Sequence, residues 1–303
     1  MSYVVRTHGL TKVFNGKEVV NSVSINVKKS EIYGFLGPNG AGKTTVMKMI
    51  TNLLKPTSGE IEIFGERLTA SSYNVLKRMG SIIEYPAFYE HLSGRENLEL
   101  HCEYMGYNSP HCVDNALEML DLSRTGKTPV QNYSLGMKQR LGLARAMLTK
   151  PELLILDEPM NGLDPAGIKH IRDLLKMLCE ENGTTILISS HILSEIENTA
   201  HTIGIINHGK LVRELTIQEV HDINLAYLEL AAENVKQAAF VLTEYLHLTN
   251  FKLMDGKIIR IYDTSVTAQD LSRKLIQNDV AIESLSKKSE TLEDYFLKIT
   301  EGR

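Results

Sequence analysis

A glycine-rich segment between a short apolar strand and a helical pattern constrains this chain more than any other part of its sequence. The strand is Glu31–Leu36, the helical spacing covers Lys43–Leu54, and the residues between them fit G-x-x-x-x-G-K-[ST]: Gly37, Pro38, Asn39, Gly40, Ala41, Gly42, Lys43 and Thr44. This context suits the pattern, because it places backbone N–H groups and the positive end of a helix around a phosphate. Lys43 supplies a point charge for the β- and γ-phosphates, and the Thr44 hydroxyl is a ligand for Mg²⁺. The segment predicts a nucleoside triphosphate site.

Two neighbouring carboxylates, Asp157 and Glu158, follow a second apolar strand that begins at Leu153. In an open parallel sheet, ligands bind at the carboxyl ends of the strands, so we expect Asp157 to meet the Mg²⁺ held by Thr44. Glu158 is placed to polarise a water for attack on the γ-phosphate. His191 also follows a strand, and there it could contact the γ-phosphate or the attacking water, although a lone histidine is more often a surface or core residue.

Strand and helix patterns alternate over residues 1–220, which favours an α/β sheet covered by helices. Between about residues 90 and 150 the strand signals disappear and helical ones dominate, so this stretch is expected to be a helical insertion on the sheet. After about residue 220 a new series begins, in the order strand, helix, hairpin, helix, strand, helix: Ala226–Leu230, Glu233–Leu246, Phe251–Met254 with Ile258–Tyr262, Thr267–Asn278, Val280–Leu285 and Leu292–Ile299. We expect a small α+β domain over residues 221–303.

Composition and charge exclude several classes of protein. The chain has 303 residues, of which 43% are hydrophobic and 23% are charged, as in ordinary globular proteins. Its formal net charge of −4 gives no global electrostatic attraction for nucleic acid. No segment approaches the ~18 consecutive apolar residues that a membrane-spanning helix needs, and the N-terminus has no signal-peptide pattern. The three cysteines are expected to be reduced thiols of a cytosolic protein.

The run Tyr133–Arg140, YSLGMKQR, completes an ordered set of motifs that resembles the ATP-binding subunit of an ABC transporter. The resemblance covers about residues 1–220 and implies a P-loop NTPase core with an antiparallel β subdomain and a helical subdomain. It matches Walker A to Gly37–Thr45, Walker B to Leu153–Pro159 with Glu158 as the base, the D-loop to residues 161–165 with Asp164, and the switch histidine to His191. It also places Phe14 where the family has an aromatic residue stacked on adenine.

Two departures from the family pattern concern the nucleotide site. The usual signature L-S-G-G-Q is Y-S-L-G-M here, so Ser134 and Gly136 remain while Leu135 and Met137 replace a glycine and a glutamine. By the resemblance, the two retained residues contact the γ-phosphate of ATP bound to the opposite subunit. The second departure is Glu84, which stands where the family has a glutamine that binds Mg²⁺. A carboxylate can also bind Mg²⁺, but it adds negative charge beside the phosphates.

The resemblance implies two kinds of partner. Two copies should face head to tail, with each ATP between the Walker loops of one and the Ser134–Gly136 turn of the other. A separate integral membrane permease should dock near Glu84–Tyr89, where Pro86, Phe88 and Tyr89 are apolar for a loop; ordinary packing under the insertion is the alternative. The chain is then expected at the cytoplasmic face of the membrane, held there by the permease.

Sequences beyond the core motifs narrow the subfamily. IEYPAFY at 83–89, ISSHILSEIE at 188–197 and the terminal LEDYFLK resemble ATPase subunits of bacitracin-resistance and lantibiotic-immunity exporters. This resemblance implies ATP-driven export of, or resistance to, a peptide antibiotic. The domain over 221–303 is expected to mediate dimer contacts or regulation, or to be a stabilising addition.

The sequence leaves two alternative functions to be considered. A soluble ABC ATPase acting on the ribosome usually carries two tandem ATPase units, and one acting on DNA carries coiled coils or paired C-x-x-C motifs; this sequence has one unit and neither of those motifs. A non-hydrolysing regulatory module is disfavoured because Lys43, Asp157, Glu158 and His191 are all in place.

Overall fold

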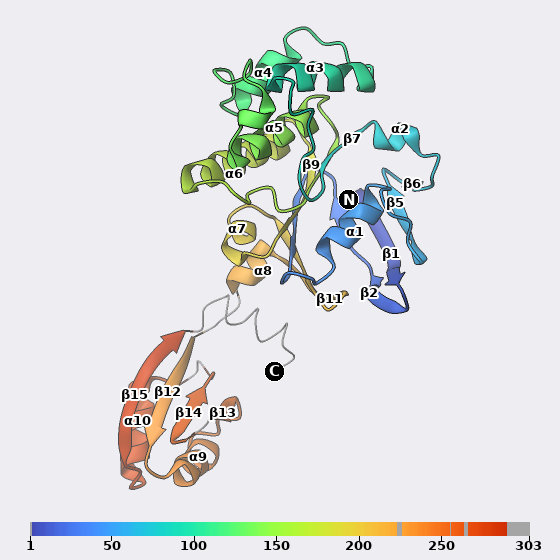
Figure 1. Cartoon of the computed structure of the whole chain (residues 1–303). Coiled ribbons are helices and arrows are strands. Elements are labelled where there is room, and N and C mark those ends of the chain that lie inside the picture. Colours follow the sequence, from blue (N-terminus) through green and yellow to red (C-terminus); the bar gives the residue numbers. More distant parts are fainter. Residues whose placement is uncertain (1, 223–225, 255, 264–265, 290–303) are drawn as a thin grey trace. The chain divides into compact units, whose positions relative to one another are not determined.

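The computed structural model describes the chain except for residues 1, 223–225, 255, 264–265 and 290–303 (Figure 1). The backbone divides into two compact units, Met1–Val220 and His221–Arg303. Each unit has its own sheet or sheets and its own buried apolar cluster.

A six-stranded sheet forms the centre of the first unit, in the order β11-β10-β4-β9-β8-β7. All neighbouring pairs are parallel except β10 and β11, which pair antiparallel at one edge. The central strands read as short continuous apolar runs, as expected for parallel strands buried on both faces. The strands are β4 (Ile32–Leu36), β7 (Met79–Ile82), β8 (Leu153–Leu156), β9 (Thr185–Ser190), β10 (Thr202–Asn207) and β11 (Lys210–Thr216). Because the five parallel strands run the same way, their carboxyl ends meet at one edge.

A second, antiparallel sheet is built mainly from the N-terminal residues, drawn in blue in Figure 1. Its order is β2-β1-β5-β6, with β3 also paired to β1: β1 (Tyr3–Phe14), β2 (Lys17–Val23), β3 (Asn26–Lys28), β5 (Ser58–Ile63) and β6 (Glu66–Arg67). Helix α1 (Lys43–Ile50) contributes Val46, Met47, Met49 and Ile50 to one buried cluster with residues of both sheets. The cluster fixes α1, and hence the loop before it, between the two sheets.

Helices cover the opposite face of the central sheet at two glycines that permit close approach. A Cβ at Gly80 of β7 would lie 1.9 Å from the Ala146 carbonyl oxygen of α5, and one at Gly34 of β4 would lie 2.4 Å from the Ile196 side chain of α7. These strands therefore accept helices at a distance that no larger residue allows. The helices of this region are α5 (Leu135–Met147), α6 (Pro165–Glu180), α7 (Leu193–Glu197) and α8 (Ile217–Asp222).

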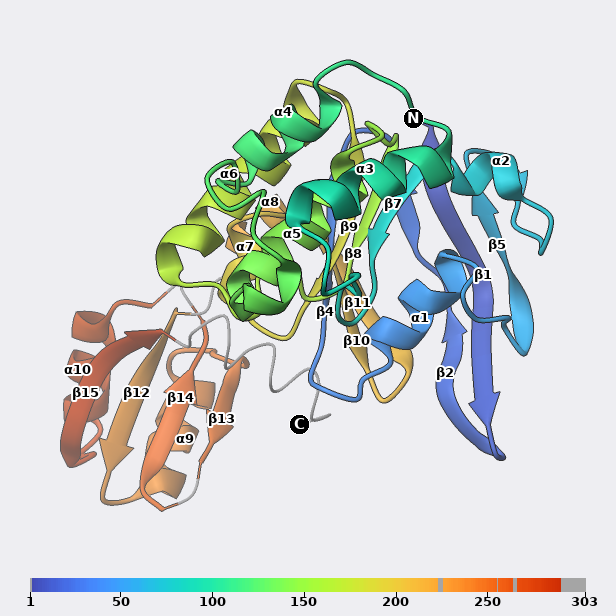
Figure 2. The same ribbon diagram turned by 45° about the horizontal axis from the view of Figure 1, so that its top comes forward.

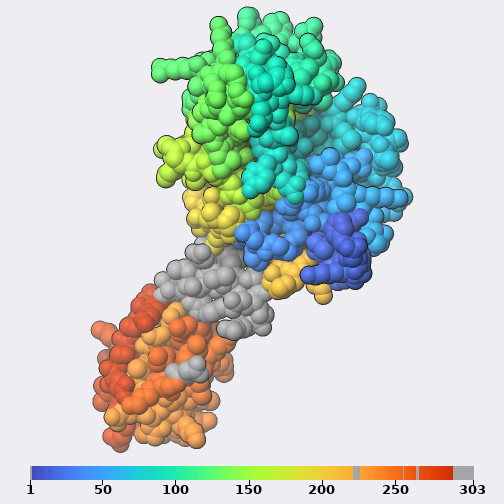
Figure 3. All heavy atoms as spheres, viewed as in Figure 1, coloured from blue at the N-terminus to red at the C-terminus, as the bar shows by residue number. Residues whose placement is uncertain are grey.

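The expected helical insertion lies at one end of this unit and is drawn in green in the upper part of Figures 2 and 3. It contains α3 (Gly94–Met105), α4 (Cys112–Met119), the 3₁₀ turn η1 (Val130–Asn132) and the start of α5; the short α2 (Tyr73–Leu76) precedes β7. Ser93 and Glu96 form a reciprocal capping box that begins α3. The predicted α/β class with a helical insertion is confirmed.

The described residues of the second unit form a four-stranded antiparallel sheet with two helices. Its strand order is β13-β14-β12-β15 and its chain order is strand, helix, two strands, helix, strand: β12 (Ala226–Ala232), α9 (Val235–Glu244), β13 (Phe251–Leu253), β14 (Ile258–Ile261), α10 (Ala268–Gln277) and β15 (Ile282–Ser289). Leu230, Leu242, Ile261 and Leu271 are among the fully buried members of its core. The predicted final helix, Leu292–Ile299, lies outside the described residues.

Candidate functional site

The phosphate loop, Gly37–Thr45, leaves the carboxyl end of β4 and enters α1. Pro38, Asn39 and Gly40 are exposed at its tip. Gly42 lies directly before α1 with φ +106°, a backbone conformation that L side chains rarely adopt, and a Cβ there would lie 3.0 Å from the Val19 carbonyl oxygen. The loop can therefore turn its backbone N–H groups into one concave surface at a helix N-terminus, which is an anion-binding geometry.

Lys43 lies folded inside this loop, with only 6% of its surface exposed. Its Nζ donates to the Gly37 carbonyl oxygen at 2.6 Å and to the Pro38 carbonyl oxygen at 3.3 Å. The same ammonium lies 3.4 Å from Oε1 of Glu158. The residue predicted to bind phosphate is thus held at the loop by groups that a phosphate oxygen can replace.

Glu158 lies between the two other groups predicted to act on the γ-phosphate. Its Oε1 faces Lys43, and its Oε2 lies 2.9 Å from Nδ1 of His191. The backbone of Glu158 has φ +48°, an uncommon value for a residue with a side chain. The geometry brings Lys43, Glu158 and His191 into one cluster at the carboxyl ends of β4, β8 and β9.

Asp157 is a buried acid of the site that accepts three hydrogen bonds. It is 3% exposed, and its Oδ2 accepts a hydrogen bond of 2.7 Å from the Thr44 hydroxyl and one of 3.4 Å from the Glu84 backbone N–H. Its Oδ1 accepts a hydrogen bond of 2.6 Å from Ser189. A hydroxyl and a carboxylate this close offer the hard oxygen ligands that Mg²⁺ prefers, so these residues fit the predicted ion.

The side chain of Glu84 points to a different partner from the one that the sequence suggested. Its Oε1 pairs with Nζ of Lys48 on α1 at 2.7 Å, and it is 56% exposed. Only its backbone N–H reaches Asp157. Lys48 therefore offsets the charge that a glutamate brings to a position where the family has glutamine.

The signature residues and the D-loop aspartate begin two neighbouring helices. The Ser134 hydroxyl accepts from the Met137 N–H at 3.3 Å and begins α5, while Asp164 accepts from the Gly167 N–H at 3.2 Å and begins α6. A Cβ on Gly136 would lie 3.2 Å from the Gly162 carbonyl oxygen, so the two turns are adjacent. Within the described part of the chain, no hydrogen bond or ion pair joins Ser134 or Asp164 to the phosphate loop.

Phe14 and Thr45 are the two remaining residues predicted for this site. Phe14 ends β1, is 43% exposed, and has Nζ of Lys12 5.1 Å from its ring centroid. Thr45 is the third residue of α1 and is half-buried. An exposed aromatic ring with a cation over one side is available to stack on a base with the other.

Two residues of the site were missed by sequence reasoning. Ser189 joins Asp157 to the backbone of Glu158, and buried Gln139 of α5 donates to the Pro159 carbonyl oxygen at 3.1 Å. Ser189 could have been found, because it stands at the carboxyl end of β9 like His191. The contact of Gln139 could not, because it depends on how α5 packs against the loop after β8.

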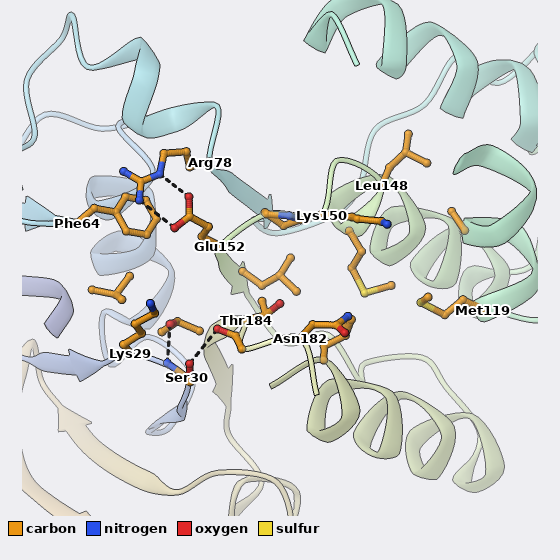
Figure 4. Close-up of a pocket in the computed structure, with 18 of the residues that line it drawn as sticks. Lys29, Ser30, Phe64, Arg78, Met119, Leu148, Lys150, Glu152, Asn182 and Thr184 are labelled. Carbon is orange, nitrogen blue, oxygen red and sulfur yellow. Dashed lines mark hydrogen bonds and ion pairs between the residues drawn. The ribbon is translucent and has the colours of Figure 1, made fainter. Parts of the chain in front are cut away.

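A cavity of the first unit lies at the opposite edge of the sheet (Figure 4). It has a volume of about 1010 Å³ and is lined by residues at the amino ends of β8 and β9, such as Glu152 and Thr184. Glu152 is paired there with Arg78, whose guanidinium also stacks on the Phe64 ring. No predicted site residue lines this cavity, so the chemistry must be sought at the carboxyl edge, where the named side chains converge.

Comparison with known proteins identifies the family of the chain. The profile of the ABC transporter family matches residues 20–161. The chain is 57% identical over 302 residues to an uncharacterized ABC transporter ATP-binding protein of Bacillus subtilis, YcbN, covering 100% of this chain and 98% of the relative. It is 46% identical over 302 residues to the bacitracin transport ATP-binding protein BcrA of Enterococcus faecalis, again covering 100% and 98%. The structure resembles the dimeric, post-hydrolysis ATP-binding cassette MJ0796 bound to ADP and Pi, with a TM-score of 0.65 and 27% identity, covering 70% of this chain and 98% of the other.

Proposed function

The chain belongs to the ABC transporter ATP-binding proteins, and we propose that it hydrolyses ATP to drive a separate membrane permease in the export of, or resistance to, a peptide antibiotic of the bacitracin type. The observation that carries the chemistry is the convergence of Lys43, Glu158 and His191 beside the phosphate loop. The observation that favours this cargo is the 46% identity to the bacitracin transport protein BcrA, which extends over both units of the chain.

Hydrolysis requires that phosphate replace the present partners of Lys43. When a triphosphate enters the loop, its oxygens take the place of the Gly37 and Pro38 carbonyl groups and of Glu158 around the ammonium. The carboxylate of Glu158 is then released to accept a proton from the attacking water. His191, 2.9 Å from that carboxylate, orients it and donates to the γ-phosphate oxygen. These roles are divided so that binding of the substrate frees the base.

Thr44 and Asp157 would hold Mg²⁺, with Glu84 as a further candidate ligand. The ion would supply positive charge to the phosphate oxygens as the terminal phosphate is transferred. Thr44 and Asp157 already bond to each other at 2.7 Å. Glu84 would have to leave Lys48, and this exchange distinguishes it from the glutamine of other family members.

A second copy of the chain would complete the site. Ser134, Gly136 and Asp164 lie on adjacent turns at the starts of α5 and α6, where the Ser134 hydroxyl and the Asp164 carboxylate accept from backbone N–H groups of their own helices. In a head-to-tail pair they would meet the nucleotide held by the Walker loops of the partner subunit, while Phe14 would stack on the adenine of the nucleotide bound to its own chain. Binding of two ATP would close the pair, and hydrolysis would reopen it.

The permease would dock beside the loop that carries Glu84. Of the residues predicted for docking, Tyr89 is 49% exposed, and its neighbour Tyr85 is 81% exposed, so these two side chains are accessible to a partner. Pro86 and Phe88 are half-buried, and they lie against Gly142 and Arg145 of α5. Among the described residues no helix is long and apolar enough to cross a membrane. The unit over 221–303 would add dimer contacts or regulation.

Antibiotic susceptibility tests the transport function. Cells that carry this gene together with that of its membrane subunit should tolerate more bacitracin than cells lacking both, and Lys43→Ala should abolish the gain. The same cells should be tested with a lantibiotic and with an unrelated antibiotic. Unchanged susceptibility to both peptide antibiotics would reject the proposed cargo, while ATP hydrolysis by the purified chain would still stand.

A further inference from the structure

We infer that Ser189 is a positioning residue for hydrolysis, which couples the carboxylate of Asp157 to the backbone of Glu158 through one buried hydroxyl. This inference rests on the roles proposed for these two acids. Ser189 is 0% exposed and is the fifth residue of β9. Parallel pairing aligns Leu156 of β8 with Ile188 of β9, which brings the next residues, Asp157 and Ser189, side by side.

The Ser189 hydroxyl both donates and accepts a hydrogen bond, and both of its partners belong to the site. Its oxygen donates to Oδ1 of Asp157 at 2.6 Å and accepts from the Glu158 backbone N–H at 2.9 Å. The first bond orients the Asp157 carboxylate, whose other oxygen faces the Thr44 hydroxyl. One side chain therefore sets the direction of the oxygen proposed for Mg²⁺ and also ties down the residue proposed as the base.

The second bond restrains the backbone of Glu158, which has an unfavourable conformation. Glu158 has φ +48°, and a non-glycine residue stays in that region only when its surroundings hold it there. The bond from its N–H to Ser189 is one such restraint, and the bond from the Asn161 N–H to its carbonyl oxygen at 3.1 Å is another. Without the Ser189 hydroxyl, the Glu158 N–H loses its hydrogen-bond acceptor inside the protein. The backbone that places the Glu158 side chain between Lys43 and His191 is then less restrained.

The neighbouring serine shows that this arrangement is specific to one position. The Ser190 hydroxyl donates to Oε2 of Glu195 at 2.6 Å and accepts from the Ile192 N–H at 3.0 Å. It therefore stabilises the segment after β9 and bonds to neither of the site acids. A third buried hydroxyl on the same strand, that of Thr185, accepts from the Ser30 N–H at 3.0 Å at the opposite end of β9. Thr185 is the matched control, since it is equally buried and far from the carboxyl edge.

The test compares Ser189→Ala with Thr185→Val in the full-length chain. Three quantities are measured: the Mg²⁺ concentration at half-maximal binding of a fluorescent, non-hydrolysed ATP analogue, the affinity for that analogue in EDTA, and the rate of ATP hydrolysis at saturating Mg²⁺. Removing a group that orients a metal ligand typically costs 10- to 100-fold in metal affinity or activity. We expect Ser189→Ala to raise the Mg²⁺ midpoint and lower turnover, each by about tenfold or more, with affinity for the analogue in EDTA unchanged. Thr185→Val should stay within about twofold of the wild type in all three measurements.

Each other outcome counts against the inference. If Ser189→Ala matches the wild type, the hydroxyl does not position the acids. If Thr185→Val shows the same losses, or if affinity in EDTA falls equally, the effect is general destabilisation. Should Ser189→Ala fail to fold, Ser189→Cys fills the same space with a weak donor and is expected to show the same selective losses; normal values in that variant would overturn the inference. If the wild-type chain itself shows no Mg²⁺-dependent binding of the analogue, the proposed function fails first.

Discussion

The ammonium of Lys43 lies 3.4 Å from the carboxylate of Glu158. The cation proposed to bind phosphate is therefore paired with the carboxylate proposed to accept a proton from the attacking water. His191 contacts the other oxygen of the same carboxylate. The pair is mostly withdrawn from solvent, with side-chain exposures of 6% and 18%. Each oxygen of the Glu158 carboxylate therefore already has a partner. Binding of a triphosphate would remove Lys43 from it, which links substrate binding to activation of the base.

Lys43→Ala is expected to weaken ATP binding by about 10- to 100-fold, the usual cost of a hydrogen bond to a charged group. The reason is that no other ammonium lies inside the phosphate loop among the described residues. Binding of a fluorescent ATP analogue measures the effect. Lys77→Ala, which removes an exposed lysine of the same unit, is the control and should bind normally. Normal affinity in Lys43→Ala would refute the assignment of the loop.

Glu84→Ala is expected to raise the Mg²⁺ concentration for half-maximal hydrolysis by about tenfold, while Glu84→Gln should stay within about threefold because an amide oxygen is also a Mg²⁺ ligand. The ion pair of Glu84 with Lys48 is largely exposed, so neither change should alter the free energy of unfolding by more than about 1 kcal/mol. Titration of Mg²⁺ at fixed ATP gives the result. An alanine variant with an unchanged midpoint would remove Glu84 from the ligands.

Sequence patterns predicted the fold class and the residues that converge on the site, for reasons that are local. The phosphate loop needs a strand before it and a helix after it, and acids that follow parallel strands must meet at one edge. The direction of a side chain in a loop has no such periodicity. This is why the contact between Glu84 and Lys48, on a different element, and that between Gln139 and Pro159 emerged only from the packed structure.

Gly162→Ala is expected to disturb the turn that faces the signature residues. Gly162 has φ +77°, and its new Cβ would lie 2.6 Å from the Leu135 side chain, so the change combines about 1–2 kcal/mol of backbone cost with a steric conflict. We expect weaker ATP-dependent dimerisation, measured by light scattering. Adding Leu135→Gly removes the steric part and should recover some of the dimer. Full dimerisation of the single variant would show that this turn does not face the partner subunit.

Two of the three cysteines are expected to resist alkylation in the folded chain. Burial, followed by the hydrogen bond between the Cys102 and Cys112 thiols, raises the pKa of the Cys102 thiol to about 12, and burial beside Glu180 raises that of Cys179 to about 11. Because only the thiolate reacts, these raised pKa values leave few reactive groups at pH 8, and labelling should increase as the pH rises. Iodoacetamide labelling followed by peptide mass spectrometry measures this, with denatured protein as the control. Rapid labelling of Cys179 in the folded chain at pH 8 would contradict its burial.

The central claim is that Glu158, released from Lys43 by ATP, acts as the base for hydrolysis. The most direct measurement is the rate of phosphate release by the purified wild-type chain and by Glu158→Gln at saturating MgATP. A general base contributes about 10²- to 10⁴-fold, so we expect the variant to bind ATP normally and to turn over at least about 100-fold more slowly. Near-normal hydrolysis by Glu158→Gln would contradict the account.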